Sequence, residues 1–509
     1  MNRRVPDRPD AVEWAATWAQ RWFLDEFGDD RLALPDGTSG GWAFHVESFE
    51  ALVRLAREQR DGVSPQSMHP VAVLKRQGYD RQARSWGLRL LNATSRTSSD
   101  QGPIAVIGEI PTPSMLEPLV AVARELGSRV AVGAADPRVY RRFAAERLRP
   151  RALVIPLGAQ REALREGRRA LRPLLTSLRR DPPAMPLDGV DIGHEAIETL
   201  LPIASRSIPW AGVERSALRE FLTASGARSV LLASDQHRIG RITSQVAREM
   251  GVRSIVAQHG LPRIPVGLLP VVANRVAAWS DESAAWFTTH GTDPGRVIVT
   301  GNPRLDAARS GGRAPSQQLV GDQLGISGSP NLLLALSPDG RDANPSLVAT
   351  ALAALERLPE ARLVVKLHPG QGEWSWVAGQ VRSSLAADRV RIARAEALPP
   401  LLRWADLTLL HRSTIALESL AYGTPIAVIG VAGTTSGADA ELRNLAPPVA
   451  RTDGDIVAIA EDVTSDAGRR RYLGERSEAL ERAVGPLDGR SSSRIASLLL
   501  EEAAASPRT

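Results

Sequence analysis

From residue 104 onward, short apolar runs alternate with longer segments in which apolar residues recur every three to four positions. The short runs predict buried strands, and the longer segments predict amphipathic helices that cover a sheet. This alternation predicts parallel strands in a doubly wound α/β fold. The expected strands lie within 104–110, 128–134, 151–157, 229–234, 254–260 and 275–280 in a first series, and within 331–337, 362–370, 389–393, 407–410 and 425–430 in a second.

The chain of 509 residues is too long for one hydrophobic core, so more than one domain is expected. The polar segment 311–318 separates the two series. We therefore expect two tandem Rossmann-like domains that face a cleft. The predicted parts are a helical N-terminal extension at 1–100, a first Rossmann-like domain at 101–306, a second at 307–466, and closing helices at 467–509 that could pack on either domain.

Two predicted helices can be read in more than one way. Trp14, Trp18 and Trp22 share one helix face in the extension, and core packing is the favoured explanation. An acceptor platform or an interfacial anchor is the alternative. Segment 161–180 interleaves leucines with arginines and is favoured as a solvated interdomain helix, although a basic amphipathic helix can also lie on an anionic bilayer.

The composition narrows the classes of function. No apolar run reaches the roughly 18–20 residues of a membrane helix, and residues 1–14 contain no apolar signal core, so a cytoplasmic protein is expected. The absence of cysteine excludes disulfides, thiolate metal sites and cysteine nucleophiles. The net charge of +6 favours an acidic partner, which could be a nucleotide-linked donor, a polyanionic polymer or a membrane surface. A dedicated nucleic-acid binder is disfavoured, because the charges are spread out and no known reader motif occurs.

The second series carries cationic and histidine side chains at a strand end. The apolar run within 362–370 ends on Lys366, His368, Pro369 and Gly370, which brings a histidine and a tight turn to the carboxyl end of a strand. Ligands bind at such ends in doubly wound sheets. Lys366 is one of only two lysines in an arginine-rich chain, which suggests that a compact ammonium suits this position.

A helix start follows the neighbouring strand at 407–410. Ser413 and Thr414 open this helix, and its free backbone N–H groups and hydroxyls are suited to an anion. Glu418 lies one turn further along and could accept hydrogen bonds from ribose hydroxyls. The two strand ends together predict a site for a nucleotide phosphate.

Three further candidates follow strands of the first series. Asp235 and His237 come after the strand within 229–234, and His259 comes after the next strand. Gly260 follows His259 and allows a ligand to approach closely. Histidine has a pKa suited to accepting a proton from a hydroxyl near neutral pH, so His259 is the favoured general base. Asp339, in a turn of the second series, is a lesser cleft candidate for which a turn role is favoured.

Four motifs occur in an order that resembles a known group of enzymes. They are QHGLP at 258–262, TGNPRLD at 300–306, KLHP at 366–369 and the Ser/Thr pair at 413–414. Together they resemble nucleotide-dependent transferases of GT-B fold that build cell-surface polymers. The likeness is closest to the CDP-glycerol glycerophosphotransferases, with relatives among the bacterial sialyl- and polysialyltransferases, and it covers roughly residues 100–460.

The resemblance implies roles for individual residues. His259 falls on the histidine that supplies the proposed base, and His368 falls on the histidine that holds the donor phosphate. Arg304 falls within a motif at the crossover between the domains, and is expected to bind the donor. The chain departs from the family at Gln258, where a tryptophan is usual, and at Glu418, which stands where sugar-nucleotide GT-B enzymes bind ribose.

These features predict a transferase that moves a sugar or alditol-phosphate from a nucleotide-activated donor to an acceptor hydroxyl of a glycan, lipid-linked or small molecule. The first domain would hold the acceptor and the second the donor, with CMP- or CDP-linked donors favoured over UDP-linked ones. No metal and no further cofactor are expected, because no acidic cluster has ligand spacing. A sugar-nucleotide 2-epimerase of the same fold and a non-catalytic scaffold are the alternatives. Peripheral contact with the inner face of a membrane is a further expectation.

Overall fold

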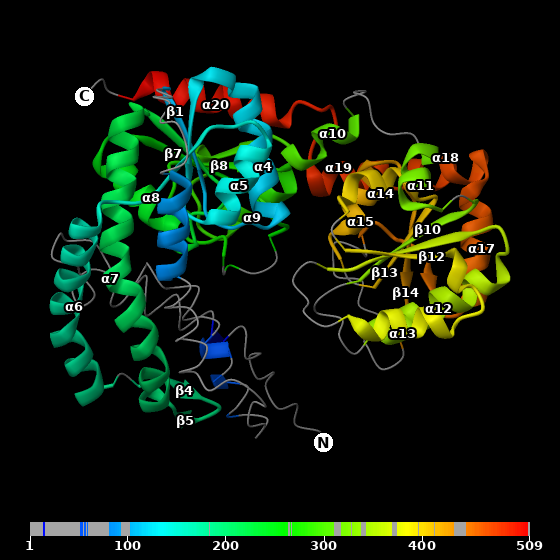
Figure 1. Ribbon diagram of the computed structural model, residues 1–509, viewed down its shortest axis with the longest axis horizontal. Coiled ribbons are helices and arrows are strands. Elements are labelled where there is room, and N and C mark those ends of the chain that lie inside the picture. Colours follow the sequence, from blue (N-terminus) through cyan, green and yellow to red (C-terminus); the bar gives the residue numbers. More distant parts are fainter. Residues whose placement is uncertain are drawn as a thin grey trace. The chain divides into compact units, whose positions relative to one another are not determined.

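The structure is a computed structural model that divides into two compact units (Figure 1). The first unit comprises Met1–Ala278, Ala284–Ile298 and Ser492–Thr509, and the second comprises Trp279–Ser283 and Val299–Ser491. Each contains one parallel sheet with helices, so the predicted pair of Rossmann-like domains is confirmed. The structure describes residues 14–15, 51–53, 55–56, 59, 81–92, 102–182, 184–262, 265, 267–309, 317–326, 328–336, 343–368, 374–394, 396–411, 413–431 and 444–506.

The first unit is built on a seven-stranded sheet in the order β3-β2-β1-β6-β7-β8-β9. Neighbouring strands from β3 to β8 pair in parallel. The chain reverses its direction of travel across the sheet between β1 and β6, which makes that point the topological switch. The strands are β1 (Ile104–Gly108), β2 (Val130–Ala134), β3 (Pro150–Ala152), β6 (Ser229–Leu232), β7 (Arg253–Ala257), β8 (Arg275–Ala278) and β9 (Val297–Val299).

Helices cover both faces of this sheet. Side chains of β1 alternate between the faces: Ile104 and Val106 lie in one buried core, and Ala105 and Ile107 lie in the other. The first core is shared with α4, α5, α20 and a helix of residues 81–92, here called the extension helix. The second core is shared with α7 and α8. The helices of this unit are α4 (Pro113–Leu126), α5 (Pro137–Ala145), α6 (Leu157–Arg180), α7 (Gly193–Ser225), α8 (Arg238–Glu249), α9 (Asp281–Thr289) and α20 (Ser491–Ala505).

Helices α6 and α7 pack against each other, joined by a small hairpin of β4 (Pro186–Leu187) and β5 (Val190–Asp191). Helix α7 was not predicted, because Pro202 and Pro209 lie inside it and proline normally breaks a helix. Gly167 of α6 allows the two helices to approach each other closely, since a Cβ at this position would lie 2.8 Å from the Cα of Pro209 in α7.

The arginine-rich helix α6 belongs wholly to the first unit, so its prediction as an interdomain helix is corrected. Leu171 is buried against α7, and Leu175 and Leu178 pack on the same core. Trp14 is buried in this core as well, and its indole N–H donates to the carbonyl of Pro186 at 2.9 Å. Core packing therefore describes Trp14, whereas Trp18 and Trp22 lie outside the described residues.

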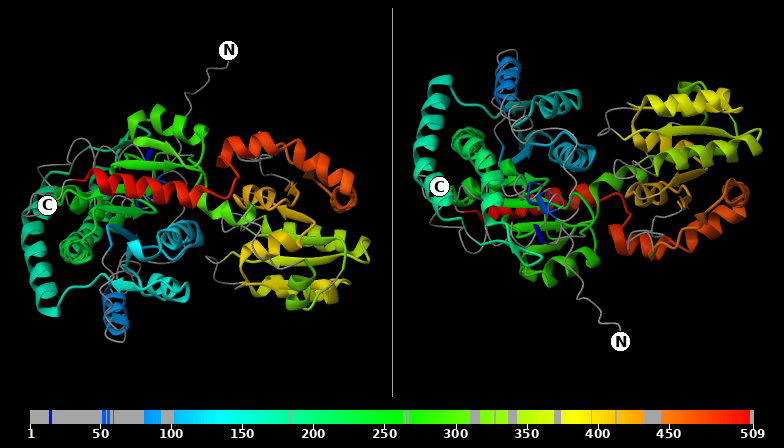
Figure 2. Two further views of the ribbon diagram at one scale, coloured as in Figure 1. Left: turned by 90° about the horizontal axis from the view of Figure 1, so that it is seen from above. Right: turned by 90° about the horizontal axis from the view of Figure 1, so that it is seen from below.

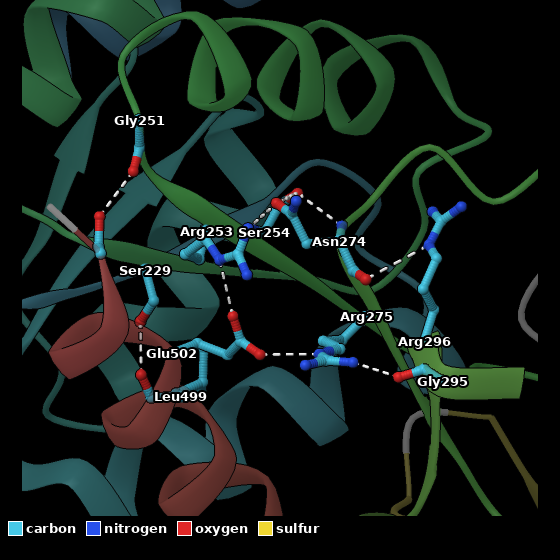
Figure 3. A network of polar contacts seen from close by, with 11 residues as sticks. Ser229, Gly251, Arg253, Ser254, Asn274, Arg275, Gly295, Arg296, Leu499 and Glu502 are labelled. Atoms are coloured by element: carbon cyan, nitrogen blue, oxygen red, sulfur yellow. Dashed lines mark hydrogen bonds and ion pairs between the residues drawn. The ribbon is translucent and has the colours of Figure 1, made fainter. Parts of the chain in front are cut away.

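The C-terminal helix α20 returns to the first unit, which is one of the two placements expected for the closing helices (Figure 2). Ile495 and Leu499 are fully buried in the core of that unit. Polar contacts hold the same helix at the amino ends of the strands, as Figure 3 shows. Glu502 pairs with Arg253 at 2.9 Å and with Arg275 at 2.7 Å. Burial alone would raise the pKa of Glu502, but hydrogen bonds from the two arginines outweigh it and hold the pKa below its usual value.

Replacing Glu502 with glutamine is expected to lower the free energy of unfolding by about 1–3 kcal/mol, because two arginines lose a charged acceptor. The folded pKa of Glu502 is depressed, so its stabilising contribution is present above the unfolded pKa of about 4.5 and is lost as pH falls below it. Urea unfolding at pH 7 and at acidic pH measures both effects. The exposed neighbour Glu501 provides the matched control, Glu501→Gln. Equal stability of the two variants at pH 7 would contradict the assignment.

The second unit has a six-stranded parallel sheet in the order β12-β11-β10-β13-β14-β15. Its switch point lies between β10 and β13. The strands are β10 (Asn331–Ala335), β11 (Arg362–Lys366), β12 (Val390–Ala393), β13 (Leu407–Leu410), β14 (Ile426–Ile429) and β15 (Val449–Ala450). The helices are α10 (Asp306–Arg309), α11 (Gln317–Leu324), α12 (Asn344–Arg357), α13 (Ser375–Ser383), α14 (Leu398–Trp404), α15 (Ile415–Ala421), α17 (Asp453–Thr464), α18 (Asp466–Gly474) and α19 (Ser477–Val484).

Among the residues that the structure describes, no helix has the length and apolar character needed to cross a lipid bilayer.

Candidate functional site

The first unit gathers its polar candidates at the carboxyl ends of β1, β6 and β7. Glu109 follows β1, the segment from Ser234 to His237 follows β6, and His259 follows β7. Because β1 and β6 flank the switch point, the loops after them leave the sheet in opposite directions and open a crevice there. A small pocket of about 20 Å³ at this point is lined by Glu109, Ser234 and His237.

Asp235 is tied to the backbone rather than presented to the pocket. Its carboxylate is 2% exposed, and Oδ2 accepts from the N–H groups of Val272 (2.6 Å) and Ala273 (2.8 Å). Oδ1 accepts from the side-chain amide of Gln236 at 3.2 Å. A carboxylate that anchors a neighbouring loop in this way favours a structural role, so Asp235 is a weaker candidate for proton transfer than the sequence suggested.

His259 is half-buried, and its environment keeps the ring uncharged. Burial, together with the nearby His237, lowers the pKa of His259 to about 4, although a hydrogen bond with the carbonyl of Ala233 partly opposes the shift. Nδ1 is buried and has no hydrogen-bond partner within the described part of the chain. An unsatisfied buried nitrogen is uncommon, and a ligand hydroxyl could satisfy it. The space beside Gly260 is open, since a Cβ there would meet no atom within 4 Å.

His237 occupies the cap position of α8, directly beside the pocket. Its backbone N–H donates to the hydroxyl of Ser234 at 3.4 Å, and its ring is half-buried. Glu109 was missed by the sequence analysis, although it is the first charged residue after the apolar run of β1. A single charged residue at the end of an apolar run is a signal from which the sequence alone could have identified Glu109.

In the second unit, Lys366 and His368 stand at the carboxyl end of β11 as expected. The ammonium of Lys366 donates to the carbonyl of Arg394 at 2.8 Å. Burial lowers the pKa of Lys366, and the carboxylate of Glu396 partly offsets this. Its ammonium therefore already supports the loop after β12, and its contact with a phosphate stays a prediction. Pro369, Gly370 and Asp339 lie outside the described residues.

The Ser413/Thr414 pair precedes α15 at the end of β13. The hydroxyl of Ser413 accepts from the N–H of Ile415, the first residue of this short helix, at 3.2 Å. Thr414 stands at the cap position, and its side chain is exposed and makes no capping bond. Thr414 is thus the more exposed of the two, and a ligand can reach its hydroxyl.

Glu418 and Arg304, both predicted to bind the donor, are brought together by the fold. Their side chains form an ion pair of 3.0 Å in which each is largely buried. Arg304 is positioned by Asn302, whose side chain accepts from the N–H of Arg304 at 3.1 Å. A ribose bound to Glu418 would therefore meet a carboxylate whose position is already fixed by a guanidinium.

His411 is a second residue that the sequence analysis did not single out. It is the first residue after β13, beside the switch point, and it is buried. Its Nδ1 lies 2.9 Å from the carbonyl oxygen of Ile429 and must donate to it, because a carbonyl only accepts. In the neutral ring this leaves Nε2 as an acceptor.

Within the described ranges, no three or more histidine and acidic side chains are grouped in a way that could hold a metal ion.

Comparison with solved structures gives the fold. A UDP-GlcNAc 2-epimerase from Neisseria meningitidis bound to UDP-GlcNAc superposes with a TM-score of 0.52 at 14% identity, covering 78% of this chain and 99% of that one. A candidate UDP-N-acetylglucosamine 2-epimerase from Listeria monocytogenes gives 0.51 at 14% identity, covering 80% and 98%. A further UDP-N-acetylglucosamine 2-epimerase gives 0.50 at 16% identity, covering 80% and 98%. The chain therefore has the fold that these epimerases share with GT-B glycosyltransferases.

No protein-family model and no curated protein matches the sequence. The resemblance to CDP-glycerol glycerophosphotransferases and sialyltransferases thus has no support from a family or sequence match, and only the broader GT-B likeness is confirmed.

Proposed function

We propose that this protein is an enzyme that acts on a nucleotide-linked sugar, and that its reaction is epimerisation at C2 of a UDP-linked amino sugar. The observation that carries the proposal is His259, a neutral imidazole at a strand end with a buried, unpartnered Nδ1. The likeness to epimerases of the same fold, one of them bound to UDP-GlcNAc, supports this reaction over the transfer that the motifs favoured.

The chemistry of C2 epimerisation sets what the residues must do. The C2–H bond is not acidic, so its cleavage must be coupled to breaking the C1–O bond to UDP, whose leaving group takes the electron pair. UDP then returns to C1 as a proton is delivered to the other face of C2, so two proton-transferring groups are needed. We assign these roles to His259 and His237, which lie close enough for a charge on one to affect the other. In the second unit, Glu418 would accept from the ribose hydroxyls, and Lys366, His368 and Thr414 would face the diphosphate.

The test is to incubate the protein with UDP-GlcNAc in deuterium oxide and to follow the sugar by NMR. The expected result is a second set of signals from the C2 epimer, with deuterium incorporated at C2. Recovery of UDP-GlcNAc without any deuterium at C2, under conditions in which UDP binds, would exclude epimerisation of this substrate.

Transfer to an acceptor hydroxyl is the second candidate, and the order of the motifs HGLP, GNPR and KLHP favours it. Release of the nucleotide only when an acceptor is supplied would identify a transferase. The donor base is decided by a thermal-shift panel of CMP, CDP, UMP, UDP and GDP. A ligand at a hundredfold excess over its Kd stabilises by about 2.7 kcal/mol, which such a panel detects. Failure of all five nucleotides to bind would leave the scaffold role as the remaining explanation.

Glu418→Gln is expected to remove the preference for a ribonucleotide over its 2′-deoxy analogue. In the wild type the buried carboxylate would lose a donor when the 2′-hydroxyl is absent, which costs roughly 1–3 kcal/mol, or about 5- to 150-fold in affinity. Titration calorimetry with UDP and 2′-deoxy-UDP measures the ratio. The exposed Glu461 supplies the control, Glu461→Gln. Equal affinity of the wild type for the two nucleotides would remove the ribose role of Glu418.

Peripheral contact with an anionic membrane is also proposed, and α6 is the element that suits it. Leu171, Leu175 and Leu178 of α6 pack on α7, whereas its arginines are exposed and outnumber the exposed Glu162 and Glu166, so any contact would be electrostatic. Each arginine near an anionic surface contributes about 1 kcal/mol, so this contact would weaken as salt is raised.

A further inference from the structure

A second pocket of the first unit lies beside the one already described. It is lined at the carboxyl ends of the strands by Glu109, Ala135 and Leu153, which follow β1, β2 and β3. Its cavity of about 60 Å³ is several times the 10–15 Å³ that one buried water needs. Glu109 lines both pockets, so the two adjoin at the switch point.

The extension helix covers this pocket and is held there by polar contacts. Arg81 donates to the hydroxyl of Ser207 on α7 at 3.0 Å, and Ser85 donates to Gln160 on α6 at 3.1 Å. Arg84 pairs with Asp136 at the start of α5 at 3.4 Å. A helix that only covered the sheet would do so at lower cost with apolar residues, because buried polar groups lose their hydration. The buried side chains of Arg81 and Ser85 therefore give this pocket a polar wall that a ligand could contact.

The charges of the pocket are mixed. Three arginines line it, at positions 81, 84 and 238, together with Glu109 and Glu214. Arg238 pairs with Glu214 at 2.7 Å, and Arg84 pairs with the buried Asp136, which also pairs with Arg138. A phosphate or carboxylate ligand would therefore meet the carboxylates of Glu109 and Glu214 as well as the guanidinium groups, so the pocket is not a dedicated anion site.

We propose that this pocket binds a neutral monosaccharide ring. Sugar hydroxyls both donate and accept hydrogen bonds, so they can use the guanidinium donors and the carboxylate and amide acceptors at once. Trp210 lines the same pocket and offers an aromatic surface for the C–H face of the ring. The ring is either the sugar of the nucleotide-linked substrate or a separate molecule, and the site stands whether or not the reaction is epimerisation.

The experiment is saturation-transfer NMR with free N-acetylglucosamine, in the presence of UDP to fill the nucleotide site. Binding is expected in the wild type and in Trp86→Ala, because Trp86 is 56% exposed on the extension helix and does not line the pocket. Trp210→Ala is expected to weaken binding tenfold or more. Glu109→Gln, which keeps the side-chain volume, is also expected to weaken binding of the sugar tenfold or more, without a change in melting temperature. Inorganic phosphate is not expected to displace the sugar.

Two results would overturn the proposal: equal sugar binding in all variants, or displacement by phosphate. The source of the ring follows from the kinetics of UDP-GlcNAc turnover. A tenfold rise in KM in Trp210→Ala, with the Kd for UDP unchanged, identifies the ring as that of the substrate. An unchanged KM together with lost binding of the free sugar identifies a separate molecule. UDP binding and deuterium incorporation test the proposed function independently of these measurements.

Discussion

His259→Asn is expected to lower the turnover of the nucleotide sugar by about 10²- to 10⁴-fold, the usual cost of removing a group that transfers a proton. The affinity for UDP is expected to stay near the wild-type value, because the proposed nucleotide contacts lie in the second unit. Steady-state kinetics and calorimetric titration of UDP measure the two effects. His290, exposed at the end of α9, is the matched control as His290→Asn. Normal turnover in His259→Asn would leave His237 as the remaining histidine candidate for proton transfer in the first unit.

The depressed pKa of His259, about 4 against an ordinary value of 6.5, predicts how activity and stability change with pH. The ring is neutral from about pH 5 upward, so kcat/KM should show no acid limb near 6.5 from this residue. The unfolded chain takes up the proton at higher pH than the folded protein does, so stability falls as pH drops from 6.5 towards 4. His259→Asn should lose less stability than the wild type over that range, as urea unfolding at successive pH values would show.

Gly240→Ala is expected to destabilise the first unit by about 1–3 kcal/mol or more, the range for overpacked sites. A Cβ at Gly240 would lie 1.8 Å from the carbonyl oxygen of Ser234, so the loop that carries Asp235 and His237 must move. Turnover should fall together with stability, because the anchored carboxylate of Asp235 and the ring of His237 shift with the loop. Thermal unfolding and kinetics measure the two consequences.

Gly212 in α7 is the control for this substitution, since a Cβ there would meet no atom within 4 Å. Alanine is the better helix former by about 1 kcal/mol, so Gly212→Ala should leave stability unchanged or raise it. If both alanine variants gained stability, the close packing of α8 on the loop after β6 would be refuted.

The strand ends could be predicted from the sequence because they depend on local patterns. Apolar runs that stop at a polar residue placed His259, His368 and Ser413 at the correct edges of their sheets. The same logic would have selected Glu109 and His411 had it been applied to every strand. The pairing of Glu418 with Arg304 agrees with a shared role for the two residues, but the sequence contains no signal for their contact.

The parts that could not be predicted depend on contacts between distant segments. Asp235 was a candidate for proton transfer because the sequence does not show what binds its carboxylate. The backbone N–H groups that donate to it belong to Val272 and Ala273, in a loop that no motif links to Asp235. Helix α7 was missed because its two prolines argue against a helix, and its packing on α6 cannot be seen in the sequence. The pocket under the extension helix joins residues from six separate segments of the first unit, and none of these segments resembles a ligand motif by itself.

The position of α20 has a consequence for the order in which the protein folds during synthesis. The first unit is interrupted after Ile298 and is completed only by the segment that begins at Ser492. Translation of the roughly 190 residues between them takes about 10–40 s at typical rates. The second unit becomes complete in sequence only at the end of that interval, and until then the face of the first unit that will receive Ile495 and Leu499 is still uncovered. The nascent first unit is therefore expected to expose an apolar face until α20 has been synthesised.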